Sequence, residues 1–139
     1  MKKLTLLLVA FALVACGGGD KAVKGSAKSE KNDKGQYVKV SLTKEGDKIT
    51  KLDINEWYPE SEKFKKEIGA DYGMKKASKI GKEWNEQIKF LEDYIKENGI
   101  DAVKVGKDGA AESDDVKAGC TMHIGDYVST VKAAIKAAK

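Results

Sequence analysis

An apolar run near the amino terminus limits which part of this 139-residue chain can fold. The run covers the eleven residues 4–14 and is preceded by Lys2 and Lys3. It is too short for a helix that spans a bilayer, whereas a short positive region followed by such a run is typical of a secretory signal peptide. We therefore expect residues 1–15 to be removed on export and the folded part to lie downstream.

The residue that ends this region is Cys16, within the sequence Leu13-Val14-Ala15-Cys16-Gly17. The pattern resembles the lipobox of bacterial lipoproteins, in which a branched apolar residue, a tolerant position and a small residue precede a modified cysteine. The resemblance implies a diacylglycerol on Cys16. Membrane lipid would then hold the mature chain at the extracytoplasmic face of a cytoplasmic or an outer membrane. An ordinary signal peptide with an incidental cysteine is the alternative.

The segment after the cysteine is poor in apolar side chains. Residues 17–35 contain Val23 and a few alanines among many Gly, Ser, Lys and Asp residues. Such a composition does not bury enough apolar surface to offset the entropy of ordering the chain. The sequence therefore predicts a lipidated, flexible tether over residues 16–35 and a single folded domain over residues 36–139.

The basic residues of the chain are all lysines, 26 in number. Without arginine, a phosphate or carboxylate site built on bidentate guanidinium groups is excluded. The formal charge of +4 falls to near +2 when Lys2 and Lys3 are removed, and no basic stripe is interleaved with aromatic residues. We therefore expect no nucleic-acid partner.

Two extended segments open the predicted domain. The apolar residues of the first segment, 37–42, share one face, and a second segment spans residues 49–57 beyond a turn at residues 44–47. The two segments predict a β-hairpin. Because Ile49 is opposite in parity to Leu52, we expect either a β-bulge or an outward-facing Ile49.

Two helices are predicted further along the chain. Apolar residues recur every three or four positions from Ile80 to Ile95, and Asn98-Gly99 is typical of a helix end. A final helix is predicted over residues 126–139. A short helix or turn, a short strand and a polar loop are predicted over residues 60–68, 102–105 and 106–117. Strands followed by helices predict an α+β fold, in which a small antiparallel sheet opened by the hairpin packs with a long middle helix and a C-terminal helix.

The usual catalytic constellations are missing from the sequence. The single histidine, His123, excludes zinc sites built on several histidines, and Cys120 is the one cysteine besides Cys16. No set of nucleophile, base and orienting residue is recognisable. We therefore expect neither a metal site nor an enzyme. Cys120 is expected to be a small buried side chain, and the acidic pair Glu92-Asp93 is expected on a solvated helix face.

The segment Asp115-Val116-Lys117-Ala118-Gly119-Cys120-Thr121 has features that suit a bound phosphate. Gly119 permits a close approach of the backbone, and the small Ala118 and Cys120 leave space around it. Thr121 places a hydroxyl just before a predicted helix, whose free amide groups and dipole favour a phosphate. Asp115 lies six residues before Thr121, where it could orient a group or bind a metal during modification.

This segment resembles the flavinylation motif of the FMN-binding lipoprotein family, which reads Asp, two variable residues, Ser or Thr, Gly, Ala, and Thr or Ser. Asp115, Gly119 and Thr121 match the motif, whereas Ala118 replaces Ser or Thr and Cys120 replaces Ala. In that family a dedicated flavin transferase joins the final threonine through its oxygen to the phosphate of FMN. The layout of hairpin, middle helix, motif and C-terminal helix is also similar over about residues 36–139. Lipoproteins of extracellular electron transfer and treponemal membrane immunogens share this layout.

The resemblance implies a membrane-anchored electron carrier with FMN on or near Thr121, held through a phosphoester or without it. Its partners would be the flavin transferase and redox partner proteins or extracellular acceptors. A flavin ring requires apolar or aromatic surface and hydrogen-bond donors. Candidate ring contacts, each with core packing as the alternative, are Tyr72, Met74, Trp57, Tyr58 and Trp84. The alternative function is a surface-binding lipoprotein of the same fold without flavin, in which Thr121 caps a helix.

Overall fold

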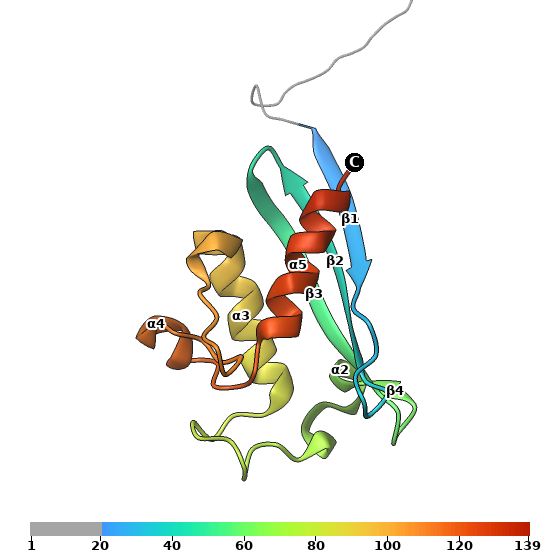
Figure 1. Cartoon of the computed structure of the whole chain (residues 1–139), viewed down its shortest axis with the longest axis vertical. Helices are drawn as coiled ribbons and strands as arrows, with labels where there is room; N and C mark the ends of the chain where they lie inside the picture. Colours follow the sequence, from blue (N-terminus) through green and yellow to red (C-terminus); the bar gives the residue numbers. More distant parts are fainter. Residues whose placement is uncertain (1–20) are drawn as a thin grey trace, which may run out of the picture.

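The computed structural model describes residues 21–139, which contain a four-stranded antiparallel sheet (Figure 1). The predicted signal peptide and Cys16 lie outside the described residues. The strands follow one another in the sheet in chain order, and they are β1 (Ala22–Lys28), β2 (Tyr37–Glu45), β3 (Lys48–Tyr58) and β4 (Lys63–Phe64).

Two long helices cover one face of this sheet. Helix α5 (Gly125–Ala137) packs against β1 and β2, and helix α3 (Trp84–Asn98) packs against β3 (Figure 1). The shorter helical elements are α2 (Lys65–Ile68), η2 (Gly69–Tyr72), η3 (Ile100–Ala102) and α4 (Asp114–Lys117). The α+β class and both predicted long helices are confirmed, although the middle helix begins at Trp84 and Ile80 precedes it. Between residues 21 and 139, no helix has the length and apolar character needed to cross a membrane.

The β2–β3 hairpin has the alternation that the sequence predicts. Leu42 pairs with Leu52, and both side chains are buried on the helix-covered face. The register shifts after Thr43, and this irregularity is the predicted bulge. It brings Ile49 back to the core, where its side chain is buried. The outward-facing alternative for Ile49 is therefore wrong.

Strand β1 corrects the prediction of a tether over residues 16–35. Residues 22–28 pair with β2 along their whole length, and the backbone N–H and carbonyl of Lys24 bond to Lys139 at 3.3 and 3.0 Å. Gly25 is buried and Ala27 packs against the core. The strand is stabilised by backbone pairing and by close contact of these small residues with α5, so it needs few apolar side chains. The composition of residues 17–35 does not reveal this stabilisation, because it does not come from apolar side chains.

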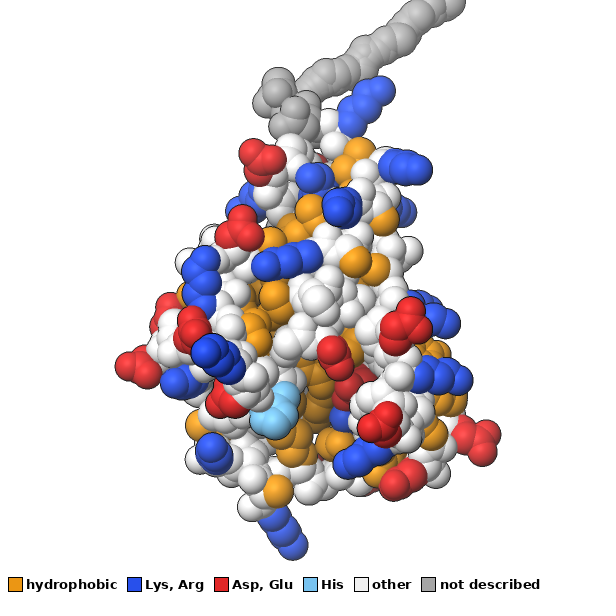
Figure 2. Space-filling model, in the orientation of Figure 1, with side chains coloured by type: hydrophobic (Ala, Val, Ile, Leu, Met, Phe, Trp, Pro, Cys, Tyr) orange, Lys and Arg blue, Asp and Glu red, His pale blue; other side chains and the backbone are white. Residues whose placement is uncertain are grey.

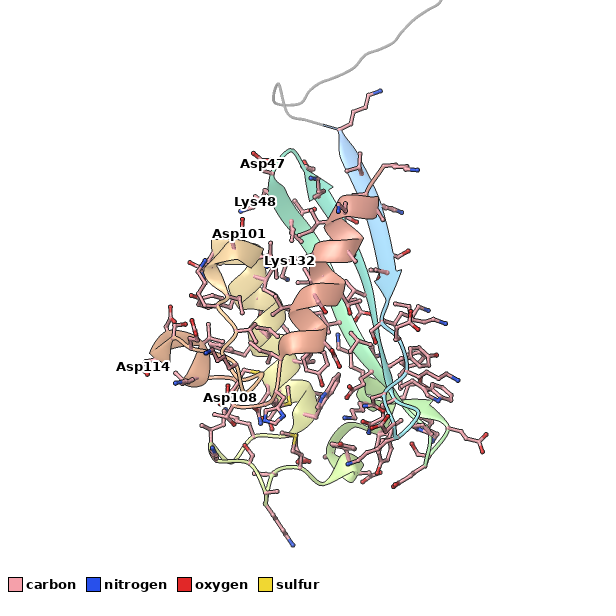
Figure 3. The ribbon with its side chains drawn as sticks, in the orientation of Figure 1. Asp47, Lys48, Asp101, Asp108, Asp114 and Lys132 are labelled. Atoms are coloured by element: carbon pink, nitrogen blue, oxygen red, sulfur yellow. The ribbon has the colours of Figure 1, made fainter. Side chains whose placement is uncertain are left out.

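The core lies between the sheet and the two long helices, while charged side chains such as Asp101, Asp114 and Lys132 point outward (Figure 3). Glu92 is an exception that corrects the predicted solvated pair. It is 5% exposed, its Oε2 accepts a hydrogen bond from the Ile54 N–H at 2.7 Å, and Lys66 lies 2.5 Å away. An ion pair and a backbone donor therefore compensate its burial.

The segment between the two long helices also differs from the prediction. The turn η3 and a single bridge between Val105 and Ala111 replace the strand expected at residues 102–105. Helix α4 interrupts the loop expected at residues 106–117, and its Val116 is fully buried. This segment is therefore part of the packed domain, and it leads directly into the predicted motif.

Candidate functional site

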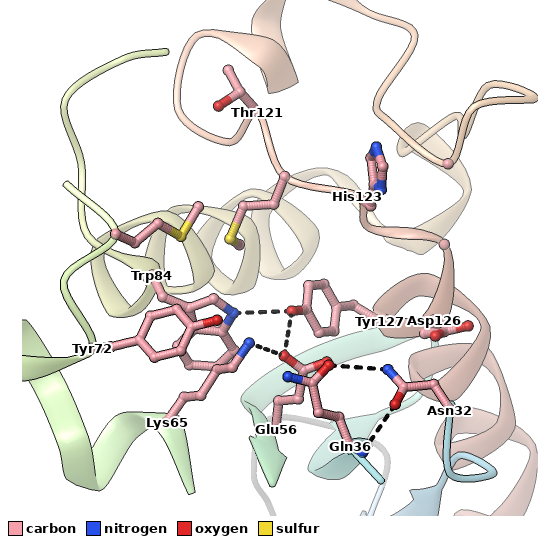
Figure 4. A pocket seen from close by; sticks show the side chains of 14 residues that line it. Asn32, Gln36, Glu56, Lys65, Tyr72, Trp84, Thr121, His123, Asp126 and Tyr127 are labelled. Atoms are coloured by element: carbon pink, nitrogen blue, oxygen red, sulfur yellow. Dashed lines mark hydrogen bonds and ion pairs between the residues drawn. The ribbon is translucent and has the colours of Figure 1, made fainter. Parts of the chain in front are cut away.

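An open cavity of about 600 Å³ lies between the start of α5, the end of β3 and the loop after η2 (Figure 4). Hydrophobic side chains are visible in the hollow beside His123 (Figure 2). Its volume falls within the range of roughly 300–1,000 Å³ that is common for small-molecule sites. A hollow of similar volume, about 620 Å³, lies on the sheet between β1 and β3. The cavity at α5 is the one that Thr121, Tyr72 and Met74 line.

The wall of the cavity contains a chain of buried polar groups. The indole N–H of Trp84 donates to the Tyr127 hydroxyl at 2.9 Å, and that hydroxyl donates to Glu56 Oε1 at 3.1 Å. The Lys65 ammonium forms an ion pair with the same Glu56 oxygen. Burial, and secondarily the charge of Glu56, raises the pKa of Tyr127 well above its usual value of 10.0. Tyr127 therefore stays a neutral donor at physiological pH.

Aromatic rings surround the ammonium of Lys65. Its nitrogen lies 4.5 Å from the centroid of the Tyr72 ring, 5.5 Å from Trp84 and 5.8 Å from Tyr58. Tyr58 and Tyr72 pack edge to face with centroids 5.2 Å apart. Tyr72 and Trp84, which line the cavity, can therefore offer aromatic surface beside a cation to a ligand there, whereas Tyr58, a predicted ring contact, lies outside the lining.

Thr121 is half-buried, and a buried glutamine fixes its position. The Thr121 N–H donates to Gln87 Oε1 at 2.9 Å, and its hydroxyl lies 3.5 Å from the same oxygen. The Gln87 amide donates in turn to Ser78 Oγ at 3.0 Å and to the Lys82 carbonyl at 3.1 Å. Thr121 is not the cap of α5, because Ile124 occupies that position. The cap function named as the alternative for Thr121 is therefore wrong.

The other residues of the predicted motif lie outside the cavity lining. A Cβ on Gly119 would come within 2.3 Å of the Phe90 ring, so the predicted close approach is made to Phe90. Ala118 is exposed. Cys120 is fully buried, as predicted, and its burial raises the pKa of the thiol to about 11.

Asp115 is exposed on α4. Its carboxylate accepts a hydrogen bond from the Tyr94 hydroxyl at 2.7 Å. The neighbouring Ser113 hydroxyl, and then the hydrogen bond from Tyr94, lower the pKa of this carboxyl below its usual value of 3.8. Asp115 is therefore an exposed carboxylate at neutral pH, available to another protein but not to a ligand in the cavity.

The site contains residues that were not predicted, among them Glu56, Lys65 and Gln87. Glu56 shares its parity in β3 with the buried Leu52 and Ile54, and a carboxylate at such a position is a signal that sequence reasoning could have used. The short helix α2 places Lys65 in the wall, and nothing in the local sequence separates Lys65 from its neighbour Lys66. Trp57, a predicted ring contact, lies outside the cavity lining and stacks on Tyr37.

Within residues 21–139, no group of three or more His, Cys, Asp or Glu side chains is placed to hold a metal ion. No protein-family model matches this chain, and no curated protein sequence matches it. A solved structure is similar: the solution NMR structure of a structural-genomics target from Clostridium thermocellum, with a TM-score of 0.52. The match covers 84% of this chain and 89% of that chain at 20% sequence identity, so it shows a similar fold.

Proposed function

We propose that this protein is a lipid-anchored, extracytoplasmic electron carrier that holds FMN, attached through a phosphoester to Thr121. The observation that carries the proposal is the position of Thr121 in the wall of a cavity of about 600 Å³ with aromatic and thioether side chains. The motif resemblance and the cavity are independent observations, since the motif is defined by sequence alone and the cavity by the fold.

The residues of the cavity fit the two parts of FMN. Tyr72, Met74 and Trp84 offer flat or polarisable surface for the ring. Gly125 and Asp126, in the first turn of α5, line the same cavity as Thr121. The amide groups and dipole of that turn favour a phosphate near Thr121, and the opposing carboxylate of Asp126 is exposed to solvent, which weakens its repulsion. In this proposal the motif identifies Thr121 as the residue that carries FMN, and the cavity accommodates the flavin ring.

The redox chemistry in this proposal belongs to the flavin, and the protein has no substrate of its own. The chain binds and orients the cofactor, with Gln87 fixing the threonine that carries it. A flavin transferase would form the bond from Thr121 Oγ1 to the phosphorus of an activated FMN donor, such as a flavin dinucleotide. The hydroxyl would lose its proton as the pyrophosphate bond of the donor breaks and a nucleoside monophosphate leaves. Redox partner proteins or extracellular acceptors would exchange electrons, and lipid on Cys16 would keep the domain at the membrane.

The proposal is tested on full-length protein produced with its own export and flavin-transfer machinery. After purification and denaturation, flavin fluorescence should remain with the wild-type polypeptide and be absent from Thr121→Val. The control is Thr43→Val, the same substitution in β2 outside the cavity, which should retain the flavin.

Two results would overturn the proposal. One is a colourless wild-type protein without attached flavin, which would favour a surface-binding lipoprotein without flavin. The other is covalent flavin that persists in Thr121→Val. Circular dichroism of each variant establishes that a loss of flavin is not a loss of fold.

A further inference from the structure

The burial of Lys65 is unfavourable, and packing alone does not explain it. Its side chain is only 6% exposed, and a buried cation must be compensated by partners. An ammonium has three N–H donors, and among the described residues Glu56 is the hydrogen-bonding partner of this one. The rings of Tyr72, Trp84 and Tyr58 attract the charge but do not replace a full acceptor. Lys65 therefore has donor capacity left for a ligand.

The charges that line the cavity are those of Lys65, Glu56 and Asp126. Lys65 balances Glu56, whereas Asp126 is exposed at the cavity edge. Lys66, the next residue of α2, lies 2.6 Å from Asp53 and 2.5 Å from Glu92 and does not line the cavity. The positive charge among the cavity-lining side chains is therefore that of Lys65.

Thr121 and Lys65 occupy different ends of the cavity. Figure 4 shows Thr121 on one side of the cavity, and Lys65 with Glu56, Trp84 and Tyr127 on the opposite side. A flavin fastened by its phosphate at Thr121 would extend its ring toward the Lys65 end. The cation would then act on the ring, since the phosphate is held elsewhere.

We infer that Lys65 and Glu56 form a charge pair that sets the reduction potential of a flavin in this cavity. The inference rests on the proposed function. When the ring takes two electrons from a redox partner and one proton from solvent, it acquires a negative charge, whereas the oxidised ring is neutral. Lys65 therefore favours the reduced form, and Glu56, left without Lys65, disfavours it.

The test measures the midpoint potential of the flavin-loaded protein by spectroelectrochemistry. Lys65→Met should lower the potential, because it removes the cation and leaves the Glu56 carboxylate unbalanced. A tenfold loss of preference for the reduced form corresponds to about 30 mV for two electrons. Glu56→Gln should raise the potential, and the double variant should lie between the two single variants. Lys66→Met, which removes the same charge from the same helix outside the cavity, should leave the potential unchanged.

The inference is overturned if Lys65→Met has the potential of Lys66→Met, or a higher one. Thermal unfolding by circular dichroism checks that each variant folds. If Lys65→Met does not fold, the potential of Glu56→Gln alone decides, and an unchanged or lowered potential refutes the inference.

Failure of the proposed function has a different signature. The wild-type protein then carries no flavin, and the inference fails as well. If the wild type is loaded and no potential moves, the inference about Lys65 fails and the proposed function remains.

Discussion

Gly25 is a residue at which β1 approaches α5 closely, and Gly25→Ala tests whether this contact holds the domain together. A Cβ at this position would lie 2.0 Å from the Ala134 carbonyl oxygen and 3.0 Å from two atoms of Ala138. The nearest of these is a backbone atom of a helix, so it cannot rotate away. The substitution must therefore push β1 and the C-terminal half of α5 apart.

Two opposing terms set the size of the effect. Replacing glycine by alanine lowers the entropy of the unfolded chain, which by itself stabilises a protein by about 0.4–1 kcal/mol. Overpacking typically costs about 1–3 kcal/mol, and separation of the elements would also loosen the backbone bonds between Lys24 and Lys139. We expect a net destabilisation of roughly 1–2 kcal/mol. For a domain of this size that lowers the melting temperature by roughly 5–10 °C.

The assay is thermal and urea unfolding of the wild type, Gly25→Ala and the control Ser26→Ala. Ser26 is the neighbouring residue of β1 and its side chain is exposed, so its substitution should leave the melting temperature nearly unchanged. If Gly25→Ala is as stable as the wild type, or more stable, then β1 does not pack beneath α5. The prediction of a flexible tether through residue 35 would then be restored.

Three further predictions concern the site and the motif. Tyr127→Phe leaves the buried Trp84 N–H without its acceptor and should cost about 1–3 kcal/mol in urea unfolding; unchanged stability would contradict the hydrogen-bond chain. The pKa of the Cys120 thiol is about 11 in the folded protein against an ordinary 9.0, so the folded state holds the proton more tightly. Its stabilising contribution is complete below pH 9.0 and is lost as the pH rises toward 11, by up to about 3 kcal/mol. Over this window Cys120→Ala should lose less stability than the wild type, and parallel curves would argue against a buried thiol. Asp115→Ala should change stability by less than about 0.5 kcal/mol yet reduce flavin attachment measured by in-gel fluorescence, whereas full attachment would show that the transferase does not recognise Asp115.

Much of the fold is predictable because its main elements bury apolar side chains with a regular period. Residues 37–57 alternate as a half-buried strand pair must, and the parity of Ile49 leaves two alternatives, of which the structure has the bulge. Strand β1 is not predicted, because the residues that it turns toward the core are small: Gly25 is buried and Ala27 is partly buried. Its energy comes from pairing with β2 and from close approach to α5, neither of which leaves an apolar pattern.

The candidate site is predictable only in part, for a similar reason. The motif indicates Thr121, and a position outside the helix pattern indicates Tyr72 and Met74; all three line one cavity. Lys65 and Glu56 come from separate elements, α2 and β3, and meet only in the folded chain. A buried ion pair of this kind depends on tertiary packing, and the spacing of residues along the sequence does not reveal it.

The most direct test of the central claim is the mass of the peptide that contains Thr121, from protein made with its export and flavin-transfer machinery. The wild-type peptide should be heavier by FMN less one water, and fragmentation should assign the added mass to the Thr121 oxygen. The same peptide from Gln87→Leu should carry less of the modification, because the threonine loses the acceptor that fixes its backbone. An unmodified Thr121 peptide in wild-type protein, or flavin on a different residue, would contradict the proposed function.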